Sequence, residues 1–143
     1  MFCPFCSNEE TRVLESRLLE NSVRRRRECE QCNTRFTTYE QAVFHLTVLK
    51  KDGREQAFEA QKIFRSMERA CAKADAEAVQ ALSKKVEQKV LAKKLNPIPT
   101  TEIGRLVLLE LRKFDKMAYM RFASIHKSID DPKLLKKEIE YLR

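Results

Sequence analysis

The sequence predicts an α+β fold in two domains, residues 1–45 and residues 46–143. Two observations predict this division. Four of the five cysteines lie in two Cys-x2-Cys pairs within the first 32 residues, and after one hairpin signal the rest of the chain shows the apolar spacing of helices. A segment of about 45 residues buries too little apolar surface to fold readily alone. Bound metal would supply the missing folding free energy, so we expect the first domain to depend on it.

The two cysteine pairs predict a structural zinc site. Cys3 and Cys6 form the first pair, and Cys29 and Cys32 form the second. Each pair places two thiolates on one tight turn, and two such turns complete a tetrahedron around one Zn²⁺ per chain, with bonds of about 2.3 Å. The long interval between the pairs favours a rubredoxin-like zinc ribbon with a hairpin over residues 11–27. Disulfides are the alternative, but the sequence opens without a secretory signal, so we expect a reducing, cytoplasmic compartment.

Arginine carries all the positive charge of the ribbon. Up to residue 47 seven Arg balance seven Glu, and the excess charge of +8 lies entirely from Val48 onward. Guanidinium groups bind phosphate with two hydrogen bonds and read guanine in the major groove. Because side chains alternate along a strand, about half of a consecutive run can face one ligand. Either these Arg only pair with the Glu residues, or they bind DNA, and the candidates for DNA binding are Arg17, Arg24, Arg25, Arg26, Arg27 and Arg35.

A short hairpin opens the second domain. Residues 43–49 are rich in β-branched and aromatic side chains, and the pair Asp52-Gly53 that follows is a signal for a type I′ turn. Lys50 and Lys51 flank this turn, and Lys62 stands near the start of the next helix. Cations beside a helix N-terminus suit a polyphosphate. The signal is weak by itself, because the chain has no Gly-rich phosphate loop of the Walker type.

Four or five helices follow the hairpin. Ile63, Met67, Ala70 and Ala74 share one helical face. Prolines at positions 97 and 99 are expected to end the second helix. Thr100 or Thr101 is expected to cap the third. The expected helices pass through residues 63–74, 75–94, 100–111, 117–129 and 132–142.

An ordered set of short motifs runs through both domains. The motifs are Met1-Phe2-Cys3-Pro4-Phe5-Cys6, Ser16-Arg17, Val23 with the four Arg that follow, Cys29 and Cys32, Arg35-Phe36-Thr37-Thr38-Tyr39-Glu40, Val48 with Lys50-Lys51-Asp52-Gly53, Phe58, Lys62-Ile63, Tyr119, and Arg121-Phe122-Ala123-Ser124. In this order they resemble the NrdR family, bacterial repressors of ribonucleotide reductase genes in which a zinc ribbon precedes an ATP-cone. Lys51 departs from the family pattern, where Arg is usual; Lys keeps the positive charge but cannot form the two parallel hydrogen bonds of a guanidinium group.

The resemblance implies a nucleotide-sensing transcriptional repressor. Its ribbon would bind double-stranded promoter DNA, and ATP or dATP on the cone would control the size of a homo-oligomer and its affinity for DNA. For Tyr119 and Arg121, ligand contact, core packing and a subunit interface remain open alternatives. The implied nucleotide-binding residues are Val48, Lys50, Lys51, Gln56, Lys62, Ile63 and Thr100.

Other classes of function are less consistent with the sequence. Catalysis would require a nucleophile beside a base or a cluster of metal-binding carboxylates, and His45 and His126 have no evident partner. No apolar run is long enough to span a bilayer, so we expect a cytoplasmic protein without membrane contact that associates with the nucleoid when it binds DNA. The remaining alternative is a nucleotide-controlled adaptor that binds protein or RNA through its neutral ribbon.

Overall fold

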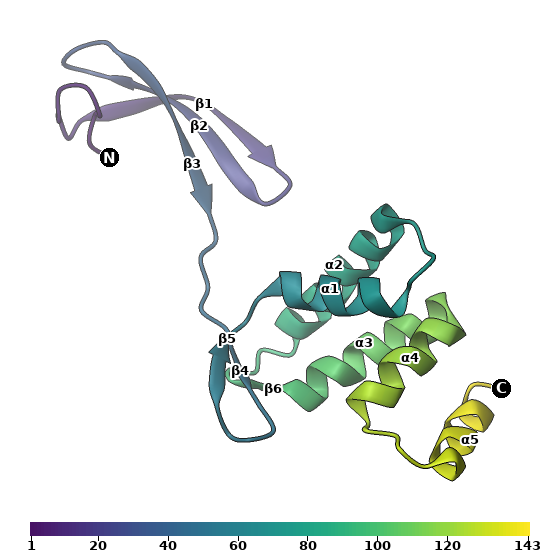
Figure 1. Cartoon of the computed structure of the whole chain (residues 1–143). Coiled ribbons are helices and arrows are strands. Elements are labelled where there is room, and N and C mark those ends of the chain that lie inside the picture. Colours follow the sequence, from purple (N-terminus) through teal and green to yellow (C-terminus); the bar gives the residue numbers. More distant parts are fainter. The chain divides into compact units, whose positions relative to one another are not determined.

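The computed structural model describes residues 1–143, which form two compact units, Met1–Phe44 and His45–Arg143. The first unit contains a three-stranded sheet, and the second contains a smaller three-stranded sheet and all five helices (Figure 1). No helix combines the length and the apolar character needed to cross a bilayer.

The first unit is an antiparallel sheet in the order β1-β2-β3. β1 (Thr11–Leu19) and β2 (Ser22–Cys29) form the hairpin that the sequence predicts. β3 (Arg35–Gln41) adds a strand that the sequence pattern does not reveal, because it contains only two large apolar side chains, Phe36 and Tyr39. Since β2 is the central strand, its consecutive Arg side chains have neighbours on both sides.

The second unit opens with a small sheet in the order β5-β4-β6. β4 (Thr47–Leu49) pairs antiparallel with β5 (Glu55–Ala57) and parallel with the two-residue β6 (Ile98–Pro99). The strand predicted over residues 43–49 is therefore too long. Asn96 explains where β4 begins, because its side chain accepts a hydrogen bond from the Thr47 N–H at 3.0 Å and donates one to the His45 carbonyl at 2.9 Å.

The turn between β4 and β5 is not the predicted type I′ turn. The Gly53 N–H donates to the Lys50 carbonyl at 3.0 Å, and the Lys50 N–H donates to the Arg54 carbonyl at 2.8 Å. Gly53 has a φ of 87°, but Asp52 lacks the positive φ that a type I′ turn requires. Lys51 and Asp52 therefore take the two central positions of the turn, whereas Lys50 stands at its start. Adjacent lysines thus belong to different parts of the hairpin.

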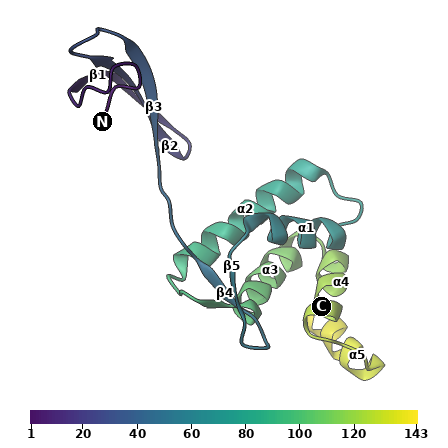
Figure 2. The same ribbon diagram turned by 60° about the vertical axis from the view of Figure 1, so that its left-hand side comes forward.

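Four of the five helices pack in a ring. Each of α1 to α4 contacts the next, α4 contacts α1, and α5 lies against α4 (Figure 2). Met67, Val86, Ile98 and Leu111 fill the core of this unit and are completely buried. The helices are α1 (Ala60–Ala70), α2 (Ala76–Ala92), α3 (Thr100–Phe114), α4 (Lys116–His126) and α5 (Pro132–Tyr141).

Three predictions about helix ends were wrong. The helix expected over residues 117–129 ends at His126, three residues early. Ala74 lies beyond α1, because the helix ends at Ala70 and the Cys71 carbonyl accepts a hydrogen bond from the Ala74 N–H in the following turn, at 2.7 Å. Neither candidate threonine caps α3, which begins at Thr100 without a side-chain cap. The Thr100 hydroxyl instead donates to the Leu49 carbonyl at 3.1 Å and ties α3 to β4.

Candidate functional site

The four paired cysteines converge on one point in the first unit. Their Sγ atoms all lie within 4.8 Å of one another, with Cys3 at 3.7 Å from Cys32 and Cys6 at 3.5 Å from Cys29. Four sulfurs bound to one Zn²⁺ in a tetrahedron are about 3.8 Å apart. The four thiols therefore fit zinc in number, type and spacing, and Cys3 and Cys29 are buried.

Both cysteine pairs use the same backbone turn. The Ser7 N–H donates to the Cys3 carbonyl at 2.9 Å, and the Asn33 N–H donates to the Cys29 carbonyl at 3.0 Å. Ser7 and Asn33 each follow the second cysteine of their pair, and both have positive φ, 60° and 56°. Two matching turns thus present the two pairs of thiols to a common centre, as a structural zinc site requires.

The register of the ribbon sheet divides the Arg run between its two faces. Arg24 and Arg26 alternate with Arg25 and Arg27 along β2, so the two pairs point to opposite sides of the sheet. Arg17 is the cross-strand partner of Arg24 and shares its face. The sequence predicts such a division but cannot assign the faces, because that requires the pairing of β1 and β3 with β2.

Arg25 and Arg27 are occupied by polar neighbours on their face of the sheet. Arg25 forms an ion pair with Glu40 at 3.0 Å. Arg27 donates to the hydroxyls of Thr38 and Thr11, each at 3.4 Å. These contacts give both guanidinium groups a structural role within the ribbon.

A buried carboxylate neutralises two further Arg on the opposite face. Glu28 is only 7% exposed and lies between Arg35 and Arg12 on the neighbouring strands. Arg35 Nε donates to Glu28 at 2.7 Å, and Arg12 also donates to it. The hydrogen bonds from Arg35 and Arg12 hold the pKa of Glu28 below its usual range. Arg35, a candidate for DNA binding, therefore already has a carboxylate partner.

The other end of this face, away from the cysteines, leaves its guanidinium groups available. Arg24 and Arg26 form no ion pair and no side-chain hydrogen bond, whereas Arg17 Nε pairs with Glu15 at 2.5 Å near the surface. Tyr39, the β3 partner of Arg24, is 60% exposed on the same face. We call Arg17, Arg24, Arg26 and Tyr39 the open Arg face.

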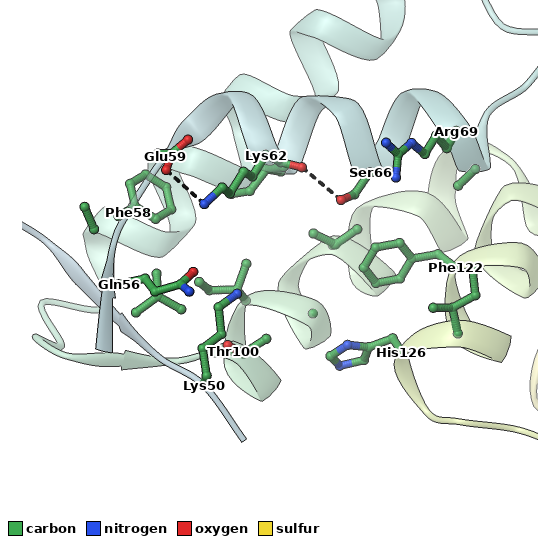
Figure 3. A pocket seen from close by; sticks show the side chains of 18 of the residues that line it. Lys50, Gln56, Phe58, Glu59, Lys62, Ser66, Arg69, Thr100, Phe122 and His126 are labelled. Carbon is green, nitrogen blue, oxygen red and sulfur yellow. Dashed lines mark hydrogen bonds and ion pairs between the residues drawn. The ribbon is translucent and has the colours of Figure 1, made fainter. Parts of the chain in front are cut away.

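The second unit contains a cavity of about 380 Å³ between the hairpin and helices α1, α3 and α4 (Figure 3). Lys51 is the one predicted nucleotide-binding residue that does not line it; its Nζ instead donates to the His126 carbonyl at 3.3 Å. The other six predicted residues all line the cavity: Val48, Lys50, Gln56, Lys62, Ile63 and Thr100.

The cavity is basic on both sides and contains one lining carboxylate. Figure 3 shows Lys50 and Lys62 on the side of Gln56, with Arg69 on the other. Lys62 Nζ pairs with Glu59 at 2.9 Å, and Lys50 has no ion pair. The apolar lining beside these cations suits a ligand that has both a flat ring system and negative charge.

Helical spacing could have identified the lining residues that the sequence analysis did not select. Ser66 and Arg69 follow Lys62 along α1 by four and seven residues and so share its face. Phe122 and His126 are likewise four residues apart on α4. That α4 faces α1 is a tertiary contact, and no local pattern in the sequence reveals it.

His126 forms one wall of the cavity. Its ring stacks on Phe122 with a centroid distance of 5.6 Å. It also lies directly against Gly104, where an added Cβ would be 1.9 Å from His126 Cε1. Burial, together with the charges of Lys51 and Lys127, lowers the pKa of His126 and favours the neutral ring.

The two α4 residues whose role was open occupy different environments. Arg121 lines the cavity, and its Nη1 donates to the Ala70 carbonyl at 2.9 Å. Tyr119 is buried in the core at 2% exposure, and its hydroxyl is hydrogen bonded to the Glu138 carboxylate.

Comparison with known families covers nearly the whole chain. Residues 1–40 match the family described as "Transcriptional repressor NrdR-like, N-terminal domain". Residues 46–132 match the family described as "ATP cone domain". The first match contains all four cysteines, and the second contains the cavity in the second unit.

The similarity to individual proteins covers all or nearly all of this chain. The "Transcriptional repressor NrdR" of Albidiferax ferrireducens is 41% identical over 148 residues, covering 100% of this chain and 99% of that protein. The protein of the same name from Corynebacterium aurimucosum is 40% identical, covering 100% of this chain and 95% of its own. That of Variovorax paradoxus is 45% identical over 136 residues, which is 92% of each chain.

Proposed function

This chain belongs to the NrdR family of transcriptional repressors, and we propose that its zinc ribbon binds promoter DNA of ribonucleotide reductase genes under the control of ATP or dATP held in the ATP-cone cavity. It is a nucleotide-sensing repressor, a regulator and not an enzyme. The observation that carries the nucleotide assignment is the convergence of six sequence-selected residues, from β4, β5, α1 and α3, on one cavity.

The cavity supplies separate surfaces for the parts of an adenine nucleotide. Val48 and Ile63 give an apolar surface for the base, while Lys50 and Lys62 give charge for the phosphates. Thr100 lies at the start of α3, where its oxygen can also accept a hydrogen bond from a ribose. ATP and dATP differ only at the 2′-hydroxyl, so discrimination between them depends on groups near the sugar.

For DNA, the open Arg face is the part of the ribbon that we assign to the duplex. Arg24 and Arg26 have no internal partner, and Arg17 is held only by an exposed pair with Glu15. Exposed pairs are weak, so a phosphate can replace the Glu. The other members of the candidate set, Arg25, Arg27 and Arg35, would support the sheet through contacts within it.

Zinc would hold the ribbon in the form that presents this face. Cys3, Cys6, Cys29 and Cys32 would be its ligands, and the bound ion would supply folding free energy to the first unit. The contacts with DNA would come from the Arg side chains of the sheet.

Control by nucleotide requires that two states of the protein differ in DNA affinity. One ribbon alone would bind weakly. A homo-oligomer that presents two ribbons at the spacing of two half-sites gains affinity through effective concentration, and one that misplaces them loses it. We propose that the nucleotide in the cavity selects between such assemblies.

Fluorescence anisotropy of a labelled promoter duplex tests this function directly. Zinc-loaded protein is titrated without nucleotide, with ATP, and with dATP plus ATP, at two salt concentrations. We expect salt-sensitive binding whose affinity changes at least tenfold with nucleotide. A DNA affinity that does not change with nucleotide would mean that the cone does not control DNA binding. Stronger competition by single-stranded RNA than by duplex DNA would favour an RNA-binding adaptor.

A further inference from the structure

A second cavity of about 370 Å³ lies beside the first, in the same unit. Helix α3 lines both cavities with different faces: Gly104 and Val107 face the first, and Leu108 and Arg112 face the second. His126 lines both cavities. The remaining walls come from the tip of the hairpin, from both ends of α4 and from the end of α5.

The lining of this second cavity is basic and includes no carboxylate. Arg105 and Lys127 pair with Glu102 at 2.7 Å and Glu138 at 2.6 Å, but neither acidic residue lines the cavity. The cations that line it are Lys51, Arg105, Arg112 and Lys127.

Two of these cations have no carboxylate partner at all. Lys51 donates to the carbonyl of His126, and Arg112 donates to the carbonyl of Tyr141 at 3.2 Å. These carbonyls belong to the last residues of α4 and α5, where a cation is favourable. One cation at each of these two helix ends would be enough for this favourable interaction with the helix carbonyls. The cavity is lined by four cations.

Aromatic rings form part of the cavity lining, while the four cations are exposed to solvent. Arg112 lies over the ring of Tyr141, 4.2 Å from its centroid, and Tyr119 and His126 complete the aromatic lining. Several positive charges that converge on one hollow attract a multivalent anion more strongly than the same charges spread over the surface do. The lowered pKa of His126, caused by burial and then by Lys51 and Lys127, is consistent with this positive field.

We propose that the cavity between α3, α4 and α5 is a second anion site, which binds a multivalent phosphate separately from the nucleotide cavity. The ligand chemistry is a chain of two or more phosphates, contacted by Arg105, Arg112, Lys51 and Lys127. Such a chain could be free polyphosphate or the phosphate tail of a nucleotide, and competition distinguishes the two sources.

The test is calorimetric titration of zinc-loaded full-length protein with inorganic tripolyphosphate in about 0.15 M salt, which screens exposed charges. The variant R105Q/R112Q removes two charges from the second cavity. K50Q/K62Q removes two charges from the first, and K84Q/K85Q removes two exposed charges from α2 that line neither cavity.

We expect wild type, K50Q/K62Q and K84Q/K85Q to retain a saturable tripolyphosphate site, and R105Q/R112Q to bind it at least tenfold more weakly. Loss of binding in K50Q/K62Q, or equal loss in K84Q/K85Q, would overturn the proposal. This readout does not depend on ATP, so failure of the proposed nucleotide function and failure of this site give different results.

Two further measurements complete the test. If R105Q/R112Q proves poorly folded, the ring resonances of Tyr141 and His126 in wild-type protein should shift with saturating tripolyphosphate, and unchanged resonances would contradict the site. Competition with excess ATP identifies the source: displacement of tripolyphosphate assigns the site to a nucleotide's phosphate chain, and persistence assigns it to free polyphosphate.

Discussion

Two adjacent lysines at the hairpin tip have different surroundings. Lys50 lines the nucleotide cavity, whereas Lys51 contacts α4 and lies outside it. Changing Lys50 and Lys62 together to Ala should weaken ATP binding at least about 100-fold, because a charged hydrogen bond contributes about 1.5–3 kcal/mol. Lys51→Ala should leave ATP affinity within about threefold. Calorimetry measures both affinities. Equal losses of ATP affinity in the two variants would mean that Lys51 also contacts the nucleotide.

The two faces of the Arg run should respond differently to salt. Each phosphate contact contributes about 0.9 to the slope of log K against log salt concentration. Arg24→Ala with Arg26→Ala should therefore lower the slope for promoter DNA by about 2. The matched control is Arg25→Ala with Arg27→Ala, which removes the same charge from the other face and should leave the slope unchanged. Equal slopes in the two variants would argue against the open Arg face.

The structure leaves no room for a side chain at Gly104. An added Cβ would collide with the His126 ring, so Gly104→Ala should lower the free energy of unfolding by about 1–3 kcal/mol. In protein that already carries His126→Ala the collision is absent, and the same change should stabilise α3 by about 1 kcal/mol, the helix propensity difference between Ala and Gly. Urea unfolding followed by helical circular dichroism measures both. Destabilisation of the same size in both backgrounds would mean that His126 is not the obstacle.

At the scale of elements, α5 is held by polar contacts more than by burial. None of its residues is buried, and its apolar side chains Leu134, Leu135 and Ile139 are 46%, 38% and 47% exposed. Glu138 joins it to α4 through Lys127 at 2.6 Å and through the Tyr119 hydroxyl. Such an element opens at low cost compared with the core.

Glu138→Gln should accordingly speed amide hydrogen exchange in α5 while α1 to α4 keep their protection. The change removes the charge that binds Lys127 but retains the shape of the side chain. Glu140→Gln is the matched control, because Glu140 is exposed on the same helix and forms no side-chain bond. If both variants exchange alike, the Glu138 contacts do not hold α5.

Sequence patterns predicted those elements whose signals are local. Cys-x2-Cys turns and helical spacing each depend on residues a few positions apart, and the zinc site and the helices were predicted on that basis. β6 consists of Ile98 and Pro99 and exists only because it pairs with β4, fifty residues earlier. The contribution of His126 to the cavity was not predicted for the same reason, since it depends on how α4 packs against α3.

At the scale of the whole molecule, each unit has its own source of stability. The buried residues of Met1–Phe44 are Cys3, Glu28 and Cys29 alone, whereas the helices of His45–Arg143 enclose an extended apolar core. A unit with so small a core depends on metal, and one with a full core does not.

Removal of zinc should therefore separate the two activities. Chelation should unfold the ribbon and abolish DNA binding, while helical circular dichroism and calorimetric ATP affinity remain within about twofold, because apolar burial stabilises the cone. Restoring zinc should restore DNA binding, and Cys29→Ser should reproduce the chelated state without a chelator. If ATP affinity fell together with DNA binding, the cone would depend on the ribbon for its stability, and control by nucleotide would have to act through a fold shared by the two units.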